Sequence, residues 1–451
     1  MHRSIDDLRL RLLRRGNDRT YRHLADAKFV AELATSRNSI DRQREAMPPG
    51  GVDAERLAAE QAVEHHSKRA DEYFGSGVDE TTHAQTDAAH ILKPFTDSVE
   101  AAHHLAAVAD LLSGLDVASG MRVLDFGCGN GWISRILVQL GCDVVLCDVS
   151  NTALELAAEA FRVSPPLESP QHREPQSLLF DGRRLELDDG SIDRIICFDA
   201  FHHVPNRAEV MAEMYRVLAP DGIAGFHEPG PDHSRKPASQ YEMVNFGFLE
   251  RDIRIGDIKR LSDEVGFSDL RLNLSAPVMP RLGVTEYNSF LRWGHIPLTF
   301  RRLMWHDASD TRAFYLIKSD GRPPDSRQSA GLAARIDVVD ITSPRADDQV
   351  GRFLVTLKNS GRARWLPSTH PTGGVRLGAH LYDADGVLQN LDFCRWDLPG
   401  SGVAPGDSTE LMITLPSTSA DSVVVLDLVS ENVTWFAKHG STPVELPTTP
   451  T

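Results

Sequence analysis

The chain of 451 residues has few cysteines and no long apolar run. Its five cysteines form no C-x-x-C pair, and four of them lie on or beside predicted strands, so we expect buried thiols that pack as small apolar side chains. No stretch of 18 apolar residues is present, and the N-terminus lacks the apolar core of a signal peptide. These absences predict a protein without a membrane span that stays in the cytoplasm.

Positive charge is also in the minority. The chain has 48 Lys and Arg residues against 64 Asp and Glu residues, which gives a formal net charge of −16. Such a charge repels phosphate backbones, so we expect no nucleic-acid partner. The length and the 41% hydrophobic content are sufficient for two or three domains, each with its own core.

The segment MRVLDFGCGNG, residues 121–131, contains the most informative motif. An apolar strand ends in Asp125 and is followed by Gly127, Gly129 and Gly131, which let the backbone turn sharply and lie close to a ligand. The spacing is G-x-G-x-G and therefore differs from the dinucleotide motif G-x-G-x-x-G. A second strand, residues 143–147, is followed by Asp148, which can accept hydrogen bonds from both hydroxyls of a ribose. The pattern predicts a nucleoside-containing ligand.

Further motifs follow in a fixed order. Asp181 and Gly182 come after a third strand, SIDRIICFD is a fourth strand, and GIAGFHEPG is a fifth strand preceded by a helix and a Pro-Asp-Gly turn. From residue 97 to residue 320 the chain resembles the class I S-adenosylmethionine-dependent methyltransferases. The resemblance implies an α/β, Rossmann-like domain of seven strands, in which strand seven, RAFYLIKSD, inserts antiparallel beside strand six.

The resemblance also implies a site for the cofactor S-adenosyl-L-methionine. Asp125 would hold the amino-acid end of the cofactor, Asp148 the ribose, and Asp181 the adenine amino group. A dehydrogenase also has an acid at the position of Asp148, but Asp125 together with Asp181 favours the methyltransferase. The expected cofactor-binding residues are Asp125, Gly127, Cys128, Gly129, Asp148, Val149, Asp181, Gly182 and Phe198.

Turn-forming residues and changes of hydrophobic period divide the sequence into four predicted regions. Residues 1–96 are expected to be helical, with helices at 4–15, 21–44 and 53–74, and the resemblance implies that they act as a lid. Residues 97–320 form the methyltransferase domain. Residues 321–333, rich in Pro, Ser and Gly, are expected to be a linker. Residues 334–451 alternate between polar and apolar side chains over about seven short strands, which predicts a C-terminal all-β sandwich.

The predicted sandwich is similar to the immunoglobulin-like module that accompanies some bacterial enzymes of surface-polysaccharide pathways, through phrases such as VRLGAHLYDADG and LDLVSENVTWF. Trp365, Trp396 and Trp435 are either sugar-stacking residues or core residues, and the core is the commoner place for tryptophan in a small sandwich. The module is also a candidate surface for a homodimer or for contact with another enzyme of the pathway.

A hydroxyl acceptor requires a base that removes its proton as the methyl group arrives. His203 is the expected base and Glu228 the carboxylate that holds its imidazole, with His202 as the substitute if the turn has the opposite orientation. The alternative is that the His pair only packs. The neighbouring pairs His65-His66 and His103-His104 lie on predicted helices and point apart, so no metal site is expected.

Residues 229–255 and 277–309, the second with several aromatic residues, are expected to roof the acceptor pocket. The most specific function that these features support is O-methylation of a saccharide or glycoconjugate in a bacterial polysaccharide pathway. A small-molecule methyltransferase of secondary metabolism is the first alternative. The second is a glycan-binding assembly module whose methyltransferase domain only senses the cofactor.

Overall fold

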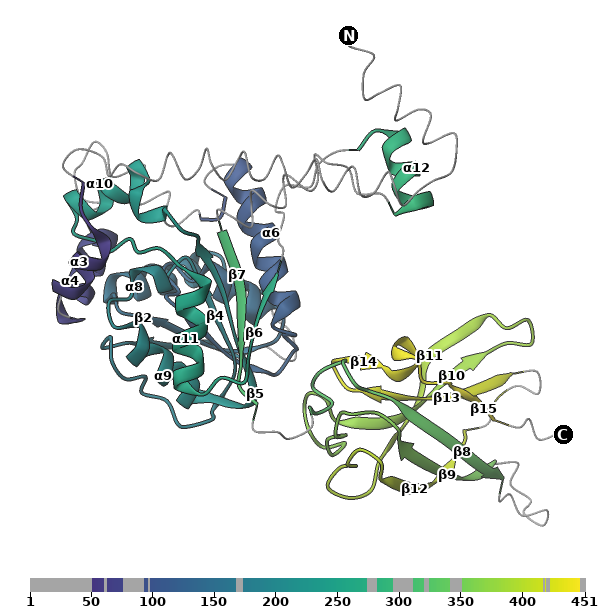
Figure 1. The fold of residues 1–451 in the computed structure, drawn as a ribbon. Coiled ribbons are helices and arrows are strands. Elements are labelled where there is room, and N and C mark those ends of the chain that lie inside the picture. Colours follow the sequence, from purple (N-terminus) through teal and green to yellow (C-terminus); the bar gives the residue numbers. More distant parts are fainter. Residues whose placement is uncertain are drawn as a thin grey trace, which may run out of the picture.

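The computed structural model describes most of the chain, in the ranges 51–60, 63–75, 93–95, 98–167, 173–273, 282–294, 311–319, 324–340, 351–416, 418 and 422–446. The helices expected at 4–15 and 21–44 lie outside these residues. Among the described helices, none has the length and apolar content that crossing a bilayer requires. Figure 1 shows an α/β body and a separate group of β-strands.

A seven-stranded sheet forms the centre of the α/β body. Its order is β3-β2-β1-β4-β5-β7-β6, and β7 is antiparallel to both of its neighbours. The predicted fold, including the insertion of strand seven beside strand six, is therefore confirmed. The strands are β1 (Arg122–Phe126), β2 (Asp143–Asp148), β3 (Gln176–Leu179), β4 (Ile192–Phe198), β5 (Leu218–Pro229), β6 (Asp269–Asn273) and β7 (Thr311–Ile317).

Helices cover both faces of this sheet. One face packs against α6 (Ser98–Gly114), α7 (Trp132–Gln139) and α8 (Asn151–Val163), and the other packs against α9 (Arg207–Val217) and α11 (Ile255–Val265). The central strands are buried on both sides, as expected for parallel strands between two helical layers. All loops at the carboxyl ends of the parallel strands therefore meet at one edge of the sheet, where ligands of open α/β sheets bind.

Two short N-terminal helices pack against the α/β body near this edge. They are α3 (Ala54–Glu60) and α4 (Val63–Gly75). Asp71 on α4 accepts hydrogen bonds from Ser150 Oγ at 2.6 Å and from the backbone N–H of Thr152 at 3.2 Å. Because Ser150 is the N-cap of α8, this contact ties α4 to the segment directly after β2.

The second group of strands forms two antiparallel sheets, one of order β11-β10-β13-β14 with β15 on β13 and one of order β12-β9-β8. Apolar residues from both sheets form a single core, so the two sheets make a sandwich. Trp365 is fully buried in that core. The strands are β8 (Ala334–Asp340), β9 (Arg352–Asn359), β10 (Val375–Tyr382), β11 (Leu388–Asp397), β12 (Ser408–Thr414), β13 (Val423–Ser430), β14 (Thr434–Trp435) and β15 (Val444–Glu445).

The expected linker, residues 321–333, is packed over its described part, which begins at residue 324. Ser326 is fully buried and donates a hydrogen bond to the carbonyl oxygen of Gly373, and Leu332 belongs to the sandwich core. Arg327 forms an ion pair with Asp193, the second residue of β4. The Pro, Ser and Gly content of this segment thus reflects turns that pack against the sandwich, and the expectation of a free linker was wrong for residues 324–333.

Candidate active site

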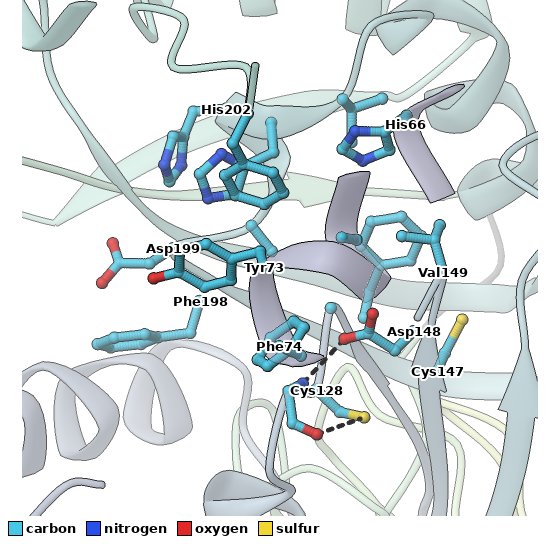
Figure 2. Close-up of a pocket in the computed structure, with 18 of the residues that line it drawn as sticks. His66, Tyr73, Phe74, Cys128, Cys147, Asp148, Val149, Phe198, Asp199 and His202 are labelled. Carbon is cyan, nitrogen blue, oxygen red and sulfur yellow. Dashed lines mark hydrogen bonds between the residues drawn. The ribbon is translucent and has the colours of Figure 1, made fainter. Parts of the chain in front are cut away.

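A cavity of about 460 Å³ lies at the carboxyl ends of β1, β2, β4 and β5. Its size is typical of pockets for small molecules and cofactors. Figure 2 shows the groups around it, with His202 and Asp148 on different sides and Tyr73 and Phe74 between them. The expected cofactor-binding residues line this cavity with the exception of Asp181.

The glycine-rich turn after β1 forms one wall. Gly127 and Gly129 have φ values of 70° and 52°, which side chains with a Cβ rarely adopt. A Cβ at Gly127 would lie 2.3 Å from the Cβ of Ala200, and one at Gly129 would lie 3.8 Å from the ring of Phe74. Gly127 is therefore required for the close approach of the segment after β4, whereas a Cβ at Gly129 would make only ordinary contact with Phe74 on α4.

Asp148 and Asp125 lie beside this turn, and both are buried. Asp148 accepts hydrogen bonds from the backbone N–H groups of Gly129 and Ser150, both at 2.9 Å, and Asp125 accepts one from Ser134 Oγ at 2.6 Å. Burial raises the pKa of Asp148 to about 6 and that of Asp125 to about 7, because few groups compensate the loss of water. A ligand with hydroxyl or ammonium donors would supply that compensation.

Asp181 has a different environment from the other two acids. Its side chain is exposed, and Oδ1 accepts hydrogen bonds from the backbone N–H groups of Arg183 and Arg184, both at 2.7 Å. Its neighbour Gly182 does line the cavity, and a Cβ there would lie 2.5 Å from Val63 Cγ1. The adenine role of Asp181 thus stays a prediction, whereas Gly182 is required for the close approach of α4.

Aromatic residues cover the cavity. The ring of Tyr73 on α4 stacks on that of Phe248 with 4.9 Å between centroids, and Phe248 contacts His203. Ser239 and Glu242 of α10 (Pro237–Asn245) complete this roof. The expectation for residues 277–309 was wrong in their described part. The aromatic side chains of α12 (Val284–Trp293) are exposed and do not line the cavity.

The turn η1 (Phe201–His203) after β4 folds around Glu228, the penultimate residue of β5. The carboxylate of Glu228 is fully buried and accepts hydrogen bonds from the backbone N–H groups of Ala200, Phe201 and His202 at 2.8–3.2 Å. It also accepts one from His202 Nδ1 at 2.7 Å. The expected pairing of Glu228 with His203 was therefore wrong, because the turn directs His202 toward β5.

His203 is held by a different acceptor. Its Nδ1 lies 2.6 Å from the carbonyl oxygen of Leu249. A carbonyl can only accept, so Nδ1 carries the proton, and Nε2 of the neutral ring keeps the lone pair. Burial, together with the charge of His202, lowers the pKa of His203 to about 3. Burial opposes a charge on His202 as well, but hydrogen bonds with Glu228 and Glu250 outweigh it and raise the pKa of His202 to about 9.

Glu250 connects the histidines at this end of the cavity. Its carboxylate lies 3.5 Å from His202 Nε2, 3.5 Å from His203 Nδ1 and 2.5 Å from Nε2 of His233. Sequence analysis missed Glu250 and His66, a buried histidine of α4 that also lines the cavity. Both lie in segments that were expected to surround the site, but no motif distinguishes them from their neighbours.

The strand order and the site together define a class I methyltransferase domain, which uses S-adenosylmethionine. Residues 124–226 match the family model described as a methyltransferase domain. This match runs from within β1 to within β5 and includes the glycine-rich turn, Asp148 and the His pair.

Two curated relatives agree with this class. The chain is 39% identical over 116 residues to methyltransferase GfsG of Streptomyces halstedii, across 25% of this chain and 39% of that protein. It is 33% identical over 114 residues to a ubiquinone biosynthesis O-methyltransferase of Xanthomonas oryzae pv. oryzae, across 24% of this chain and 42% of that protein. The chain thus spans about two fifths of the length of these relatives.

Among solved structures, the chain is similar to an S-adenosylmethionine-dependent methyltransferase from Mesorhizobium loti. The TM-score is 0.36 at 17% identity, and the match covers 48% of this chain and 97% of that one.

Proposed function

We propose that the protein transfers the methyl group of S-adenosylmethionine to a hydroxyl of a saccharide or glycoconjugate. The observation that carries the proposal is a single cavity lined by Asp148 and the glycine-rich turn at one end and by His202, His203 and Glu250 at the other. A methyl donor and an acceptor bound in these two parts would lie next to each other. Proximity and alignment are the main contributions to methyl transfer.

The buried imidazoles support a hydroxyl as the acceptor. A hydroxyl is a weak acid and requires help to lose its proton, whereas an amine or a thiolate requires less. Nε2 of His203 carries a lone pair in the tautomer fixed by Leu249, so His203 is the proposed proton acceptor of the ion-free protein. The ubiquinone biosynthesis relative from Xanthomonas oryzae pv. oryzae is named as an O-methyltransferase, which agrees with this choice.

S-adenosylmethionine supplies an electrophilic methyl group on a sulfonium centre. Asp148 would accept hydrogen bonds from its ribose, and Asp125 would face its amino-acid end. Water would be excluded from the reacting atoms by the rings of Tyr73, Phe74 and Phe248. These rings cover the cavity between the two acids and the His pair. Glu228 is a positioning residue, since its hydrogen bonds hold the turn that carries both histidines.

A small-molecule acceptor of secondary metabolism is the second candidate. The cavity of about 460 Å³ would hold the acceptor together with the cofactor, so its volume does not distinguish a monosaccharide unit from another small metabolite. The sandwich is proposed as an immunoglobulin-like module that contacts a glycan or a protein. Trp365 is unavailable for stacking on a sugar, because it is buried in the core.

Turnover with a panel of acceptors tests the proposal. The full chain is incubated with S-adenosylmethionine and with nucleotide sugars, glycolipid extracts or phenolic and macrolide hydroxyl compounds, and the products are analysed by mass spectrometry. A mass gain of one methylene unit on a saccharide supports the first candidate, and a gain on another compound alone supports the second. Binding of S-adenosylhomocysteine without any methylated product across the panel would favour a non-catalytic, cofactor-sensing role.

A further inference from the structure

We propose that His202, His203 and Glu250 bind a divalent transition-metal ion at the acceptor end of the cavity. One ligand atom from each of these three residues lies within 4.8 Å of the others. His202 and Glu250 are buried, and all three residues line the cavity. The proposed function does not include this ion, and the two proposals rest on different measurements.

The turn explains why adjacent histidines can converge here. Neighbouring side chains on an α-helix point apart, and this excluded His65-His66 and His103-His104 as chelating pairs. His202 and His203 instead lie in the short turn η1, where their ring centroids are 3.7 Å apart. The expectation of no metal site considered only helical pairs, so it does not apply to this turn.

The hydrogen bonds prepare both imidazoles as ligands. Nδ1 of His202 faces the carboxylate of Glu228, and Nδ1 of His203 faces the carbonyl oxygen of Leu249. Both acceptors fix the proton on Nδ1, so that Nε2 of each neutral ring can bind a metal. Carboxylates and carbonyls that hold the second nitrogen of a metal-binding histidine are typical of such sites.

The distance between His202 and Glu250 fits a common ion. Ligand atoms that bind one ion at about 2.1 Å lie about 3 to 4.2 Å apart, according to the coordination geometry. His202 Nε2 and Glu250 Oε2 are 3.5 Å apart, which is within that range. His233, at 2.5 Å from the same carboxylate oxygen, would orient Glu250 by a hydrogen bond and would not need to bind the ion.

Charge supports a cation at this place. Two buried carboxylates, those of Glu228 and Glu250, lie beside His202, and a buried carboxylate requires a compensating positive group. Two imidazoles and one carboxylate suit zinc, cobalt, iron or manganese better than magnesium, which prefers oxygen ligands. Three protein ligands also leave open a position for an acceptor oxygen.

The test measures binding before activity. Tag-free full-length protein is treated with a chelator and titrated with ZnCl₂ or CoCl₂, with MgCl₂ as a comparison, and the bound metal is counted by elemental analysis. We expect one zinc or cobalt ion per chain. His202→Ala, His203→Ala and Glu250→Ala should each weaken binding by at least about 10-fold, in line with the effect of losing groups around a metal site.

His103→Ala is the matched control, because His103 is an exposed histidine of α6; its metal affinity should equal that of the wild type. S-adenosylhomocysteine affinity shows whether each variant is folded. The proposal is overturned if the wild-type chain binds neither zinc nor cobalt, or if the three substitutions leave the affinity unchanged. If metal binding fails in this way, methyl transfer by the chelator-treated protein would still support the proposed function. If the chain binds the metal but transfers no methyl group with any ion, the proposed function is contradicted and the metal site stands.

Discussion

The Oε2 atom of Glu228 lies 2.7 Å from Nδ1 of His202, and the exposed fractions of the two side chains are 0% and 5%. The same carboxylate accepts hydrogen bonds from three consecutive backbone N–H groups of the turn after β4. One residue of β5 thus determines the conformation of the turn that carries both histidines.

Glu228→Ala should lower the free energy of unfolding by about 3–5 kcal/mol, because it leaves three backbone donors and Nδ1 of the buried His202 without a partner. Glu228→Gln keeps the shape of the side chain, so its effect on the free energy of unfolding should be smaller. Chemical denaturation followed by fluorescence measures both. Glu159→Ala is the control, since Glu159 forms an exposed pair with Arg162 on α8 and should contribute little to stability. An equal stability of the Glu228 and Glu159 variants would contradict the positioning role.

His203→Ala should lower kcat by about 10²-fold, the lower end of the usual contribution of a positioned base because burial lowers the pKa of His203 to about 3, and should leave cofactor affinity nearly unchanged. The reason is that His203 lines the cavity beside His202, and His202 lies on a different side of the cavity from Asp148 (Figure 2). Steady-state kinetics with an acceptor that the chain methylates measures kcat, and calorimetry with S-adenosylhomocysteine measures the cofactor affinity. Normal turnover in both His203→Ala and His202→Ala would show that the pair only packs.

The cofactor end of the site could be predicted from the sequence because local patterns determine it. Asp125 and Asp148 follow apolar strands, parallel strands end at one edge, and the glycines mark the turn between strand and helix. These features depend on residues close together in the chain, so strand periodicity and turn residues were sufficient to locate them.

The acceptor end depends on contacts between distant residues. The partner of His203 is the carbonyl of Leu249, 46 positions later, and the orientation of the His pair depends on Glu228 of another strand. No periodicity indicates which of two adjacent histidines faces β5. The prediction that residues 277–309 cover the acceptor pocket was wrong for the same reason. The cover includes the stacking of Tyr73 on Phe248, which joins α4 to the loop after α10.

Asp148→Ala should weaken S-adenosylhomocysteine binding by about 2–4 kcal/mol, because hydrogen bonds to a charged group contribute about 1.5–3 kcal/mol each. Calorimetry measures the change. The control is Glu186→Ala, which removes an exposed carboxylate outside the cavity and should have no effect. An unchanged affinity in Asp148→Ala, or tighter binding of NAD than of S-adenosylhomocysteine, would contradict the ribose role.

Cofactor affinity should rise with pH between about 5 and 8, since the pKa values of Asp148 and Asp125 in the ligand-free protein are raised to about 6 and about 7. The ionised carboxylates accept hydrogen bonds from the ligand, so binding favours loss of their protons and becomes stronger as they ionise. Because the two acids interact, the titration belongs to the pair. Calorimetry in buffers of constant ionic strength tests this, and Asp148→Asn should retain only the part due to Asp125. A flat profile for the wild-type chain would contradict the raised pKa values.

The last prediction concerns where the sandwich begins. A fragment of residues 324–451 should fold alone, because Ser326 and Leu332 pack with the sandwich. A fragment of residues 334–451 should be less stable by about 3–5 kcal/mol, since it loses the burial of one leucine side chain, about 1.5–3 kcal/mol, and at least two hydrogen bonds of about 1 kcal/mol each. Those bonds include the one that Ser326 Oγ accepts from the backbone N–H of Leu366 at 2.9 Å. Denaturant unfolding of both fragments measures the difference.

Ser326→Ala and Leu332→Ala in the longer fragment should each reproduce part of the loss. Equal stability of the two fragments would show that residues 324–333 are a dispensable linker, and an unfolded longer fragment would show that the sandwich requires the α/β body, which it contacts through the Arg327–Asp193 ion pair.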